Sequence, residues 1–339
     1  MSIKENNQEE QIENLYSKTH FLLDKYYPLV KQVNAGSLSK KELGKIFQEN
    51  LVDEIINVNN RFTQTSKIRT CGNPAFVHSL RVLLWLKIFD ADEKLLRVAL
   101  YHDLLEDFSN SLEQMESESK TIPEELLSNI LQLTNRHGDV IKTLEKERVK
   151  QSLIPDGVFF EKLFDSEIFS EVSERLKSCL QKNSLQTVKR ESYECYLQDL
   201  KRYVVETEDE IPYIVKLADR LDNTLSDWPS KFTSIIKIYS KNELVLKYSE
   251  DIVRNSTNVL FKIFFILVVE RSLDQIRFLI HNYSIIVDKR GLFYGEQYNK
   301  LLQQLKDEQE KLKPFEKLKN ELLDDEDLKL YINNLQGTN

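Results

Sequence analysis

Apolar residues recur along most of this chain at the spacing of an α-helix. The segment from Leu95 to Leu105 is apolar at helical intervals, which predicts a buried helix. The most apolar run of the chain extends from Val259 to Val269, but Lys262 interrupts it and Glu270 follows it. This run is too short to cross a bilayer, so we interpret it as a second buried helix and expect no membrane association.

Residues that break helices are scarce. The 339 residues include only 8 Gly and 7 Pro, and strands of alternating polarity between turn signals are not evident. A short apolar stretch from Ser284 to Val287 is compatible with an extended segment. Pro314 interrupts the charged C-terminal segment, where we therefore expect two helices rather than one continuous coiled coil. The sequence predicts an all-α protein.

The composition divides the chain into three predicted parts. Residues 1–60 form an acidic tail followed by helical segments, and residues 61–245 carry the polar motifs described below. Within this middle part, a stretch near residues 138–190 is interpreted as a helical insertion. Residues 246–339 form an additional C-terminal helical region, apolar at first and then highly charged. A chain of this length can bury one substantial core with an appendage.

Charge and cysteine content narrow the class of protein. The formal net charge of -8 disfavours nonspecific nucleic-acid binding, which requires a concentrated basic surface. The first ten residues are polar and acidic, unlike a signal peptide or a membrane anchor. Three cysteines without C-x-x-C spacing argue against a disulfide framework. We therefore expect a cytoplasmic protein, and the sequence leaves its oligomeric state open.

The strongest chemical signal is a histidine followed by three carboxylates within residues 101–107. In a continuous helix, Glu106 lies four residues after His102 and three after Asp103. Asp107 likewise follows Asp103 by four, so these side chains share or adjoin one face. Burying such groups unpaired is costly, whereas a divalent cation offsets their charge. The pattern therefore predicts a metal site.

Two further polar residues occupy positions where a core side chain is expected. His78 lies in an apolar stretch upstream of the cluster, and Asp219 follows another apolar stretch downstream. With His102 and Asp103 they offer two imidazole nitrogens and two carboxylates. This mixed set of donors suits Mn²⁺ and, less selectively, Fe²⁺ or Zn²⁺.

The order of these residues resembles that of a known superfamily. His78, the His102–Asp103 pair and Asp219 are similar to the H…HD…D signature of HD-domain metal phosphohydrolases. Those enzymes are helical bundles whose metal ligands come from separate helices. More narrowly, three blocks in the same order resemble the hydrolase domain of RelA/SpoT enzymes; they are Gly72 to His78, the Glu106–Asp107 pair, and Val215 to Asn223.

The resemblance, which covers residues 60 to 230, implies an activity and residue roles. The hydrolase domain of RelA/SpoT enzymes removes pyrophosphate from the 3' position of (p)ppGpp in a manganese-dependent reaction. The resemblance implies Glu106 and Asp107 as the general-base unit, and Arg69 and Asn223 as substrate-binding residues. It implies a guanosine polyphosphate as substrate and one metal rather than two, because the further ligands of dinuclear members are missing. No block resembles the synthetase domain of these enzymes.

Three functions remain open. The first is hydrolysis of the alarmone ppGpp or pppGpp. The second is a phosphohydrolase of the same superfamily acting on another nucleotide or phosphate ester. It is favoured because Thr70, Cys71 and Ala75 replace the lysine, serine and tyrosine that are usual in the family. The third is a binding module without catalysis, which the complete set of predicted ligands disfavours.

Several charged residues near Asp219 have no role that the sequence can assign. For Lys216, Arg220 and Asp222, surface pairing and substrate contact are equally compatible with the sequence. For Arg69 and Asn223, the alternative to substrate contact is an ordinary salt bridge or a helix cap. These alternatives differ in burial and partners, which a structure can show.

Overall fold

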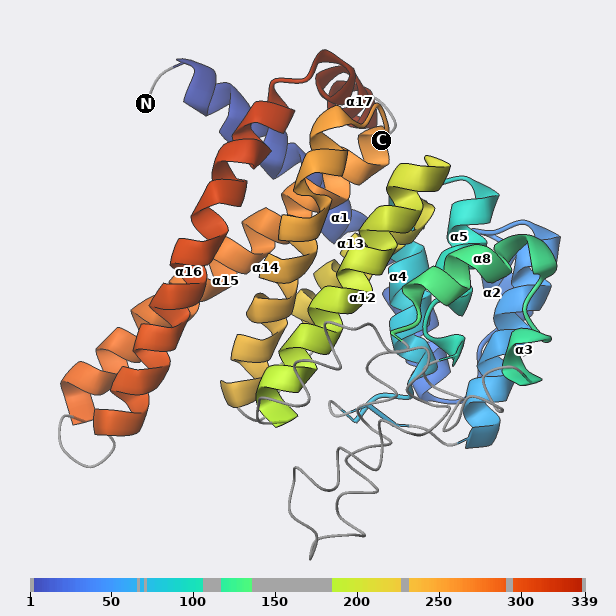
Figure 1. Cartoon of the computed structure of the whole chain (residues 1–339). Coiled ribbons are helices and arrows are strands. Elements are labelled where there is room, and N and C mark those ends of the chain that lie inside the picture. The colour runs from blue at the N-terminus through green and yellow to red at the C-terminus, as the bar shows by residue number, and fades with distance from the viewer. Residues whose placement is uncertain are drawn as a thin grey trace, which may run out of the picture. The chain divides into compact units, whose positions relative to one another are not determined.

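The computed structural model describes the chain as an almost entirely helical protein (Figure 1). No strand occurs in the described ranges, where an isolated β-bridge joins Ile68 and Pro74. The all-α prediction is thereby confirmed at the level of fold class. The residues that the structure describes are 3–65, 68–69, 72–105, 117–135, 185–226, 232–290 and 295–336.

The chain divides into two compact units. The first unit combines Met1–Tyr101 with Tyr213–Asn339, and the second is His102–Pro212. The first unit is thus built from two segments that are distant in sequence, and each unit is described separately below.

The N-terminal segment of the first unit is organised around a central apolar helix, α4. Of its 13 residues, only Arg81 and Lys87 are not fully buried. A helix that is apolar on all sides is stable only when it is covered on all sides, and α1, α3 and α5 each pack against α4 or its neighbours. The helices of this segment are α1 (Ile3–Asn34), α2 (Lys40–Leu43), α3 (Glu49–Thr65), α4 (Phe76–Ile88) and α5 (Glu93–Tyr101).

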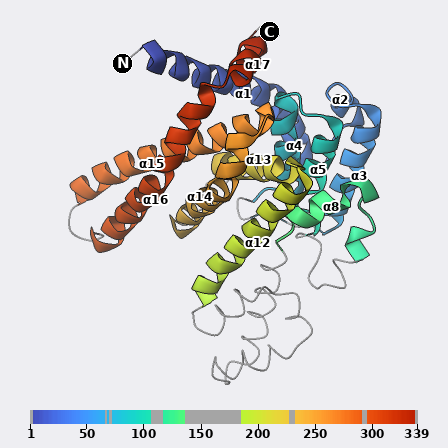
Figure 2. The ribbon, with the colours of Figure 1, turned by 45° about the horizontal axis from the view of Figure 1, so that its top comes forward.

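The described residues of the C-terminal segment of the first unit form five helices. Helices α15 and α16 lie side by side and both pack against α14, as Figures 1 and 2 show. The predicted buried helix from Val259 to Val269 forms the start of α15, which continues through residues 284–287, so this stretch is helical rather than extended. The five helices are α13 (Ile211–Ser226), α14 (Phe232–Asn255), α15 (Val259–Arg290), α16 (Gly295–Leu323) and α17 (Glu326–Gln336).

The prediction that Pro314 separates two helices is wrong. Pro314 lies inside α16, and the chain leaves the helix only after Leu323. A proline inside a helix removes one backbone hydrogen bond, but its neighbours Leu312, Phe315 and Leu318 are buried. The ring of Phe315 packs edge-on against that of Phe265 in α15. Packing of α16 against α15 therefore maintains the helix through the proline.

The described part of the second unit contains α8 (Glu124–Leu133) and α12 (Leu185–Thr207). The two helices pack together, and the Tyr196 hydroxyl donates a 3.1 Å hydrogen bond to the carbonyl of Leu133 at the end of α8. Of the predicted insertion near residues 138–190, only residues 185–190 are described, and they begin α12. The rest of that predicted insertion lies outside the described residues.

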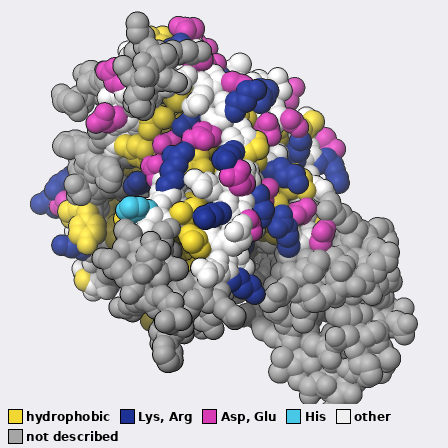
Figure 3. Space-filling view, turned by 90° about the vertical axis from the view of Figure 1, so that its left-hand side faces the viewer, with side chains coloured by type: hydrophobic (Ala, Val, Ile, Leu, Met, Phe, Trp, Pro, Cys, Tyr) yellow, Lys and Arg dark blue, Asp and Glu magenta, His cyan; other side chains and the backbone are white. Residues whose placement is uncertain are grey.

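The surface of α16 carries charges of both signs at helical spacing. Lys313 pairs with Glu310 at 2.6 Å, and Lys311 pairs with Glu308 at 2.7 Å. On the face shown in Figure 3, basic and acidic side chains are interspersed rather than gathered into one region of a single sign. Within the described residues, no helix combines the length and the apolar character that a membrane-spanning helix needs.

Candidate metal centre

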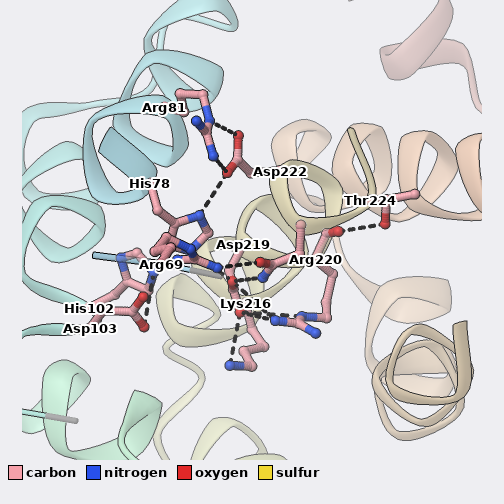
Figure 4. A network of polar contacts seen from close by, with 11 residues as sticks. Arg69, His78, Arg81, His102, Asp103, Lys216, Asp219, Arg220, Asp222 and Thr224 are labelled. Carbon is pink, nitrogen blue, oxygen red and sulfur yellow. Dashed lines mark hydrogen bonds and ion pairs between the residues drawn. The ribbon is translucent and has the colours of Figure 1, made fainter. Parts of the chain in front are cut away.

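Helices α4 and α13 bring a histidine and two carboxylates together in the first unit (Figure 4). His78 lies in the first turn of α4, while Asp219 and Asp222 are three residues apart on α13 and therefore share one face. The His78 Nε2 atom lies 3.1 Å from Asp219 Oδ1, and its Nδ1 atom lies 2.7 Å from Asp222 Oδ2. All three side chains are almost completely buried.

The two carboxylates determine the protonation of His78. A carboxylate oxygen can only accept a hydrogen bond, so each ring nitrogen that faces one must carry a proton. Burial and the charge of Arg69 lower the pKa of His78. The hydrogen bonds to Asp219 and Asp222 outweigh both and raise that pKa from 6.5 to about 9. Without a metal, His78 is therefore a buried imidazolium at neutral pH.

Arg81 holds the Asp222 carboxylate in place against His78. Its guanidinium donates through Nε to Asp222 Oδ1 at 2.8 Å and through Nη2 to Oδ2 at 3.0 Å. This two-point contact fixes the plane of the carboxylate. Burial favours the protonated form of Asp222, but the charges of Arg81 and His78 prevail and hold its pKa well below the ordinary value.

Asp219 is surrounded by cations on its other side. Lys216 Nζ and Arg220 Nη2 each lie 3.0 Å from Asp219 Oδ2. Burial raises the pKa of Asp219, yet Arg220, Lys216 and His78 together hold it well below its usual range. Asp219 is therefore ionised, and two of its cationic partners come from its own helix.

The structure also brings together the two residues that the resemblance assigns to substrate binding. Arg69 Nη2 donates a 2.8 Å hydrogen bond to Asn223 Oδ1, and Asn223 Nδ2 donates to Asp219 Oδ1. Arg69 is placed by a tight turn, in which its carbonyl accepts from the Gly72 amide at 2.9 Å. Gly72 has a φ of +85°, a left-handed conformation that favours glycine over other residues. The backbone conformation of this turn therefore explains why the motif has a glycine at position 72.

The His102–Asp103 pair lies in a turn, so the prediction of one helix from Leu95 to Leu105 is wrong. Helix α5 ends at Tyr101, and helical structure resumes at Leu104. The apolar residues on both sides of the turn remain buried, so their spacing indicated burial but not a continuous helix. His102 is also buried, and its Nε2 atom lies 3.3 Å from Asp103 Oδ1.

Several predicted residues lie outside the part of the chain that the structure describes. Glu106 and Asp107, the predicted general-base unit, are among them, as are Thr70 and Cys71. The predicted common helical face of His102 and Glu106 therefore stays a prediction. Ala75, by contrast, is described and is buried immediately before α4.

The donor atoms fit a divalent cation. Two ligands about 2.1 Å from a metal and at right angles to each other are about 3.0 Å apart. The 3.1 Å between His78 Nε2 and Asp219 Oδ1 matches this separation. The hydrogen bond from Nδ1 to Asp222 leaves Nε2 as the ligand atom, which is the usual carboxylate–histidine–metal arrangement.

Sequence reasoning did not identify Arg81, and it left Asp222 without a role. Arg81 lies three residues after His78, and Asp222 lies three residues after Asp219. This spacing places each of them on the same helical face as a predicted ligand. A search for charged residues at that spacing on both predicted helices would have found the pair.

Comparisons with known proteins do not assign the chain to a family. The chain matches no protein-family model, no curated protein and no solved structure in the three searches. The resemblance to HD-domain phosphohydrolases therefore stays a prediction from the sequence motifs, to be weighed with the geometry of the site.

Proposed function

We propose that this chain is a metal-dependent phosphohydrolase that removes the 3'-pyrophosphate of guanosine tetra- or pentaphosphate, giving GDP or GTP and pyrophosphate. The observation that carries the proposal is the placement of His78 between Asp219 and Asp222, with Arg81 behind. This arrangement orients one imidazole nitrogen toward a second potential metal ligand. The order of the motifs then suggests the reaction class.

One divalent cation, with Mn²⁺ preferred over Fe²⁺ or Zn²⁺, suits the donor set. When bound, such a cation supplies an activated water and stabilises negative charge on a phosphoryl group. Asp222 and Arg81 keep the imidazole of His78 in the orientation and tautomer that binding requires. The four proposed ligands are His78, His102, Asp103 and Asp219.

Substrate binding is assigned to Arg69 and Asn223. The hydrogen bond between them shows that one turn before α4 and one face of α13 present polar groups to the same place. An arginine suits a phosphate or the edge of a guanine, because its planar fork donates several hydrogen bonds. Glu106 and Asp107 are proposed, by resemblance alone, to accept the proton of the attacking water.

The second candidate function is a phosphohydrolase of the same class that acts on another nucleotide or phosphate ester. It is favoured by Ala75, which stands where the related enzymes usually have a tyrosine and whose methyl group is buried. A buried methyl group cannot hydrogen-bond a nucleotide. The metal chemistry proposed above is the same for both functions, so the choice between them concerns the substrate.

The test is hydrolysis of ppGpp by metal-stripped protein after addition of Mn²⁺, with GDP and pyrophosphate followed by chromatography. Asp103→Ala is the informative variant, because the Asp103 side chain is 24% exposed and its loss should leave folding intact. Glu206→Ala, an exposed carboxylate on α12, is the matched control. We expect release of both products by the native and control proteins, and at least a hundredfold slower release by Asp103→Ala.

Other outcomes separate the candidates. If ppGpp stays intact while a panel of other nucleotides and phosphate esters contains a Mn²⁺-dependent substrate, the second function holds. If no substrate is hydrolysed and Asp103→Ala binds Mn²⁺ as tightly as the native protein, the proposal of a catalytic metal site is contradicted and a binding module is favoured.

A further inference from the structure

Asn223 connects the proposed metal ligand Asp219 to the turn that precedes α4. The residue is only 8% exposed. Its Oδ1 atom accepts a 2.8 Å hydrogen bond from Arg69 Nη2, and its Nδ2 atom donates to Asp219 Oδ1. A guanidinium can only donate and a carboxylate can only accept, so these two neighbours fix the orientation of the amide. Asn223 therefore presents its donor, and not its acceptor, to Asp219.

The backbone of Arg69 is itself held by two hydrogen bonds. Its amide donates to the carbonyl of Asn73, and its carbonyl accepts from the amide of Gly72, each at 2.9 Å. The same turn leads directly into α4, which carries His78 in its first turn. Arg69 thus reaches Asn223 from a backbone position that the turn defines.

The two carboxylate oxygens of Asp219 face different groups. Lys216 Nζ and Arg220 Nη2 lie 3.0 Å from Oδ2, and Arg220 Nη2 also lies 3.2 Å from Oδ1. His78 Nε2 lies 3.1 Å from Oδ1, to which Asn223 also donates. His78 must lose its Nε2 proton to act as a ligand, so its hydrogen bond to Oδ1 is lost when a metal binds. The hydrogen bond from Asn223 needs no such change, because an amide does not lose its protons.

We propose that Arg69 and Asn223 are positioning residues for Asp219. Arg69 fixes the amide of Asn223, and this amide holds Oδ1 in the direction of His78. The chain parallels the one in which an arginine and a carboxylate hold the imidazole of His78. The inference rests on the proposed function, since it takes Asp219 as a metal ligand. It adds a role that operates before substrate binds, and each end of the amide can make a second hydrogen bond, so the proposed substrate contact is compatible with it.

The experiment measures the dissociation constant of Mn²⁺ by electron paramagnetic resonance in the absence of nucleotide and phosphate. Asn223→Leu removes the donor but nearly keeps the volume of the side chain, and we expect Mn²⁺ to bind about 10- to 100-fold more weakly. Arg69→Met should weaken binding about tenfold, whereas Arg69→Lys, which keeps a donor, should stay within about threefold of the native protein. Residues that contact only the substrate would leave this affinity unchanged.

A double variant separates the action of Arg69 through Asn223 from its other effects. The charge of Arg69 lowers the pKa of His78, so its loss also changes the competition between proton and metal. That effect, and every other contact of Arg69, is present whether or not residue 223 is asparagine, and it cancels in a double-mutant cycle. If Arg69 acts through Asn223, Arg69→Met has less than about a threefold effect in the Asn223→Leu background.

Arg254→Met is the matched control for the loss of an arginine. Arg254 lies on α14 in the same unit and pairs with Glu250 and Glu321, so its replacement should leave the Mn²⁺ affinity unchanged. Circular dichroism and urea denaturation show whether each variant is folded. If Asn223→Leu does not fold, Asn223→Ala replaces it with the same expectation.

The outcomes separate this inference from the proposed function. If Mn²⁺ does not bind the native protein, the proposed metal site fails, and the positioning role fails with it. If the native protein and folded Asn223→Leu bind Mn²⁺ equally well, only the positioning role is overturned. An equal effect of Arg69→Met in both backgrounds also overturns the chain, because Arg69 then acts through its charge or through other contacts.

Discussion

His78 is the residue on which the candidate site depends most, because its two ring nitrogens face two different carboxylates. The hydrogen bonds to Asp219 and Asp222 overcome the cost of burying an imidazolium and raise the pKa of His78 to about 9. A raised pKa in the folded state means that the folded protein holds this proton more tightly than the unfolded chain does. The charge of His78 therefore links stability to pH.

We predict that the metal-free protein loses stability as the pH rises from about 6.5 to about 9. The contribution of His78 is fully present below the pKa of the unfolded chain, near 6.5, and disappears once the pH passes the folded pKa. Urea denaturation in a chelator, repeated through this range, should show the unfolding free energy falling by a few kcal/mol. His78→Gln should be less stable at pH 6.5 and nearly independent of pH over the same interval. A native protein with a flat profile would contradict the double hydrogen bond.

Asp222 also has a predicted effect on metal binding. Asp222→Asn removes the charge that orients His78, so we expect Mn²⁺ to bind about 10- to 100-fold more weakly at high pH. The same change lowers the pKa of His78, and the affinity should stop rising with pH at a lower pH than in the native protein. Asp251→Asn, on an exposed position of α14, is the control. An unchanged pH dependence of the Mn²⁺ affinity would show that Asp222 does not affect the pKa of His78.

The residue types of the candidate site could be predicted from the sequence better than their partners could. His78 and Asp219 were singled out because they stand in apolar stretches, and Asn223 was singled out by the resemblance. The structure places the three together. The contacts of Asp222 and Arg81 depend on how α4 faces α13. The spacing of residues along one helix does not show how that helix packs against a distant one. The sequence alone therefore could not assign roles to Asp222 and Arg81.

The helices themselves were predictable, but their ends were not. The spacing of apolar residues indicates which residues are buried. This spacing continues through the turn at His102 and Asp103, so it does not show that α5 ends at Tyr101. Pro314 shows the opposite case, since a local signal for a break is overruled by the burial of its neighbours. In both places tertiary packing outweighs local preference.

Helix α13 is held in place by a buried polar network at its C-terminal end. Asn242 of α14 donates hydrogen bonds of 2.9 Å to Thr224 Oγ1 of α13 and to Ser272 Oγ of α15. Gln275 of α15 donates at 2.7 Å to the carbonyl of Thr224, one of the last-turn carbonyls that a helix leaves without an internal donor. Thr224 in turn donates to the carbonyl of Arg220. The network thus ties the site-bearing turn to two other helices.

We predict that Asn242→Leu lowers the free energy of unfolding by about 1–3 kcal/mol, because it leaves buried hydroxyl groups without a donor. The displacement of the last turn of α13 should also weaken Mn²⁺ binding. Urea denaturation and metal titration measure the two effects. Ser272→Ala removes one arm of the network away from α13 and should lower stability without affecting Mn²⁺. Equal loss of Mn²⁺ affinity in both variants would contradict a specific role for the contact with Thr224.

At the scale of the whole molecule, the first unit joins residues 1–101 to residues 213–339. Nothing in the amino-acid composition indicates that these two segments form one unit. The predicted domain boundaries therefore differ from this division. The result is that His78 and Asp219, which are 141 positions apart, lie in one unit and in contact. The fold class follows from the composition, whereas this pairing follows only from the tertiary structure.

Basic side chains neutralise the buried carboxylates of the candidate site, although the chain as a whole carries a formal net charge of -8. Arg81 contacts Asp222, and Lys216 and Arg220 contact Asp219. Both buried carboxylates are therefore held in ion pairs in the folded protein.

The central claim, that His78 and Asp219 bind a metal, is tested most directly by crystallography of the Mn²⁺-soaked protein, with diffraction collected at the manganese absorption edge. We expect one anomalous peak within about 2.3 Å of both His78 Nε2 and Asp219 Oδ1, and none there in crystals of Asp219→Asn. A native map without a peak at this position, or with manganese bound only at other carboxylates, would contradict the account.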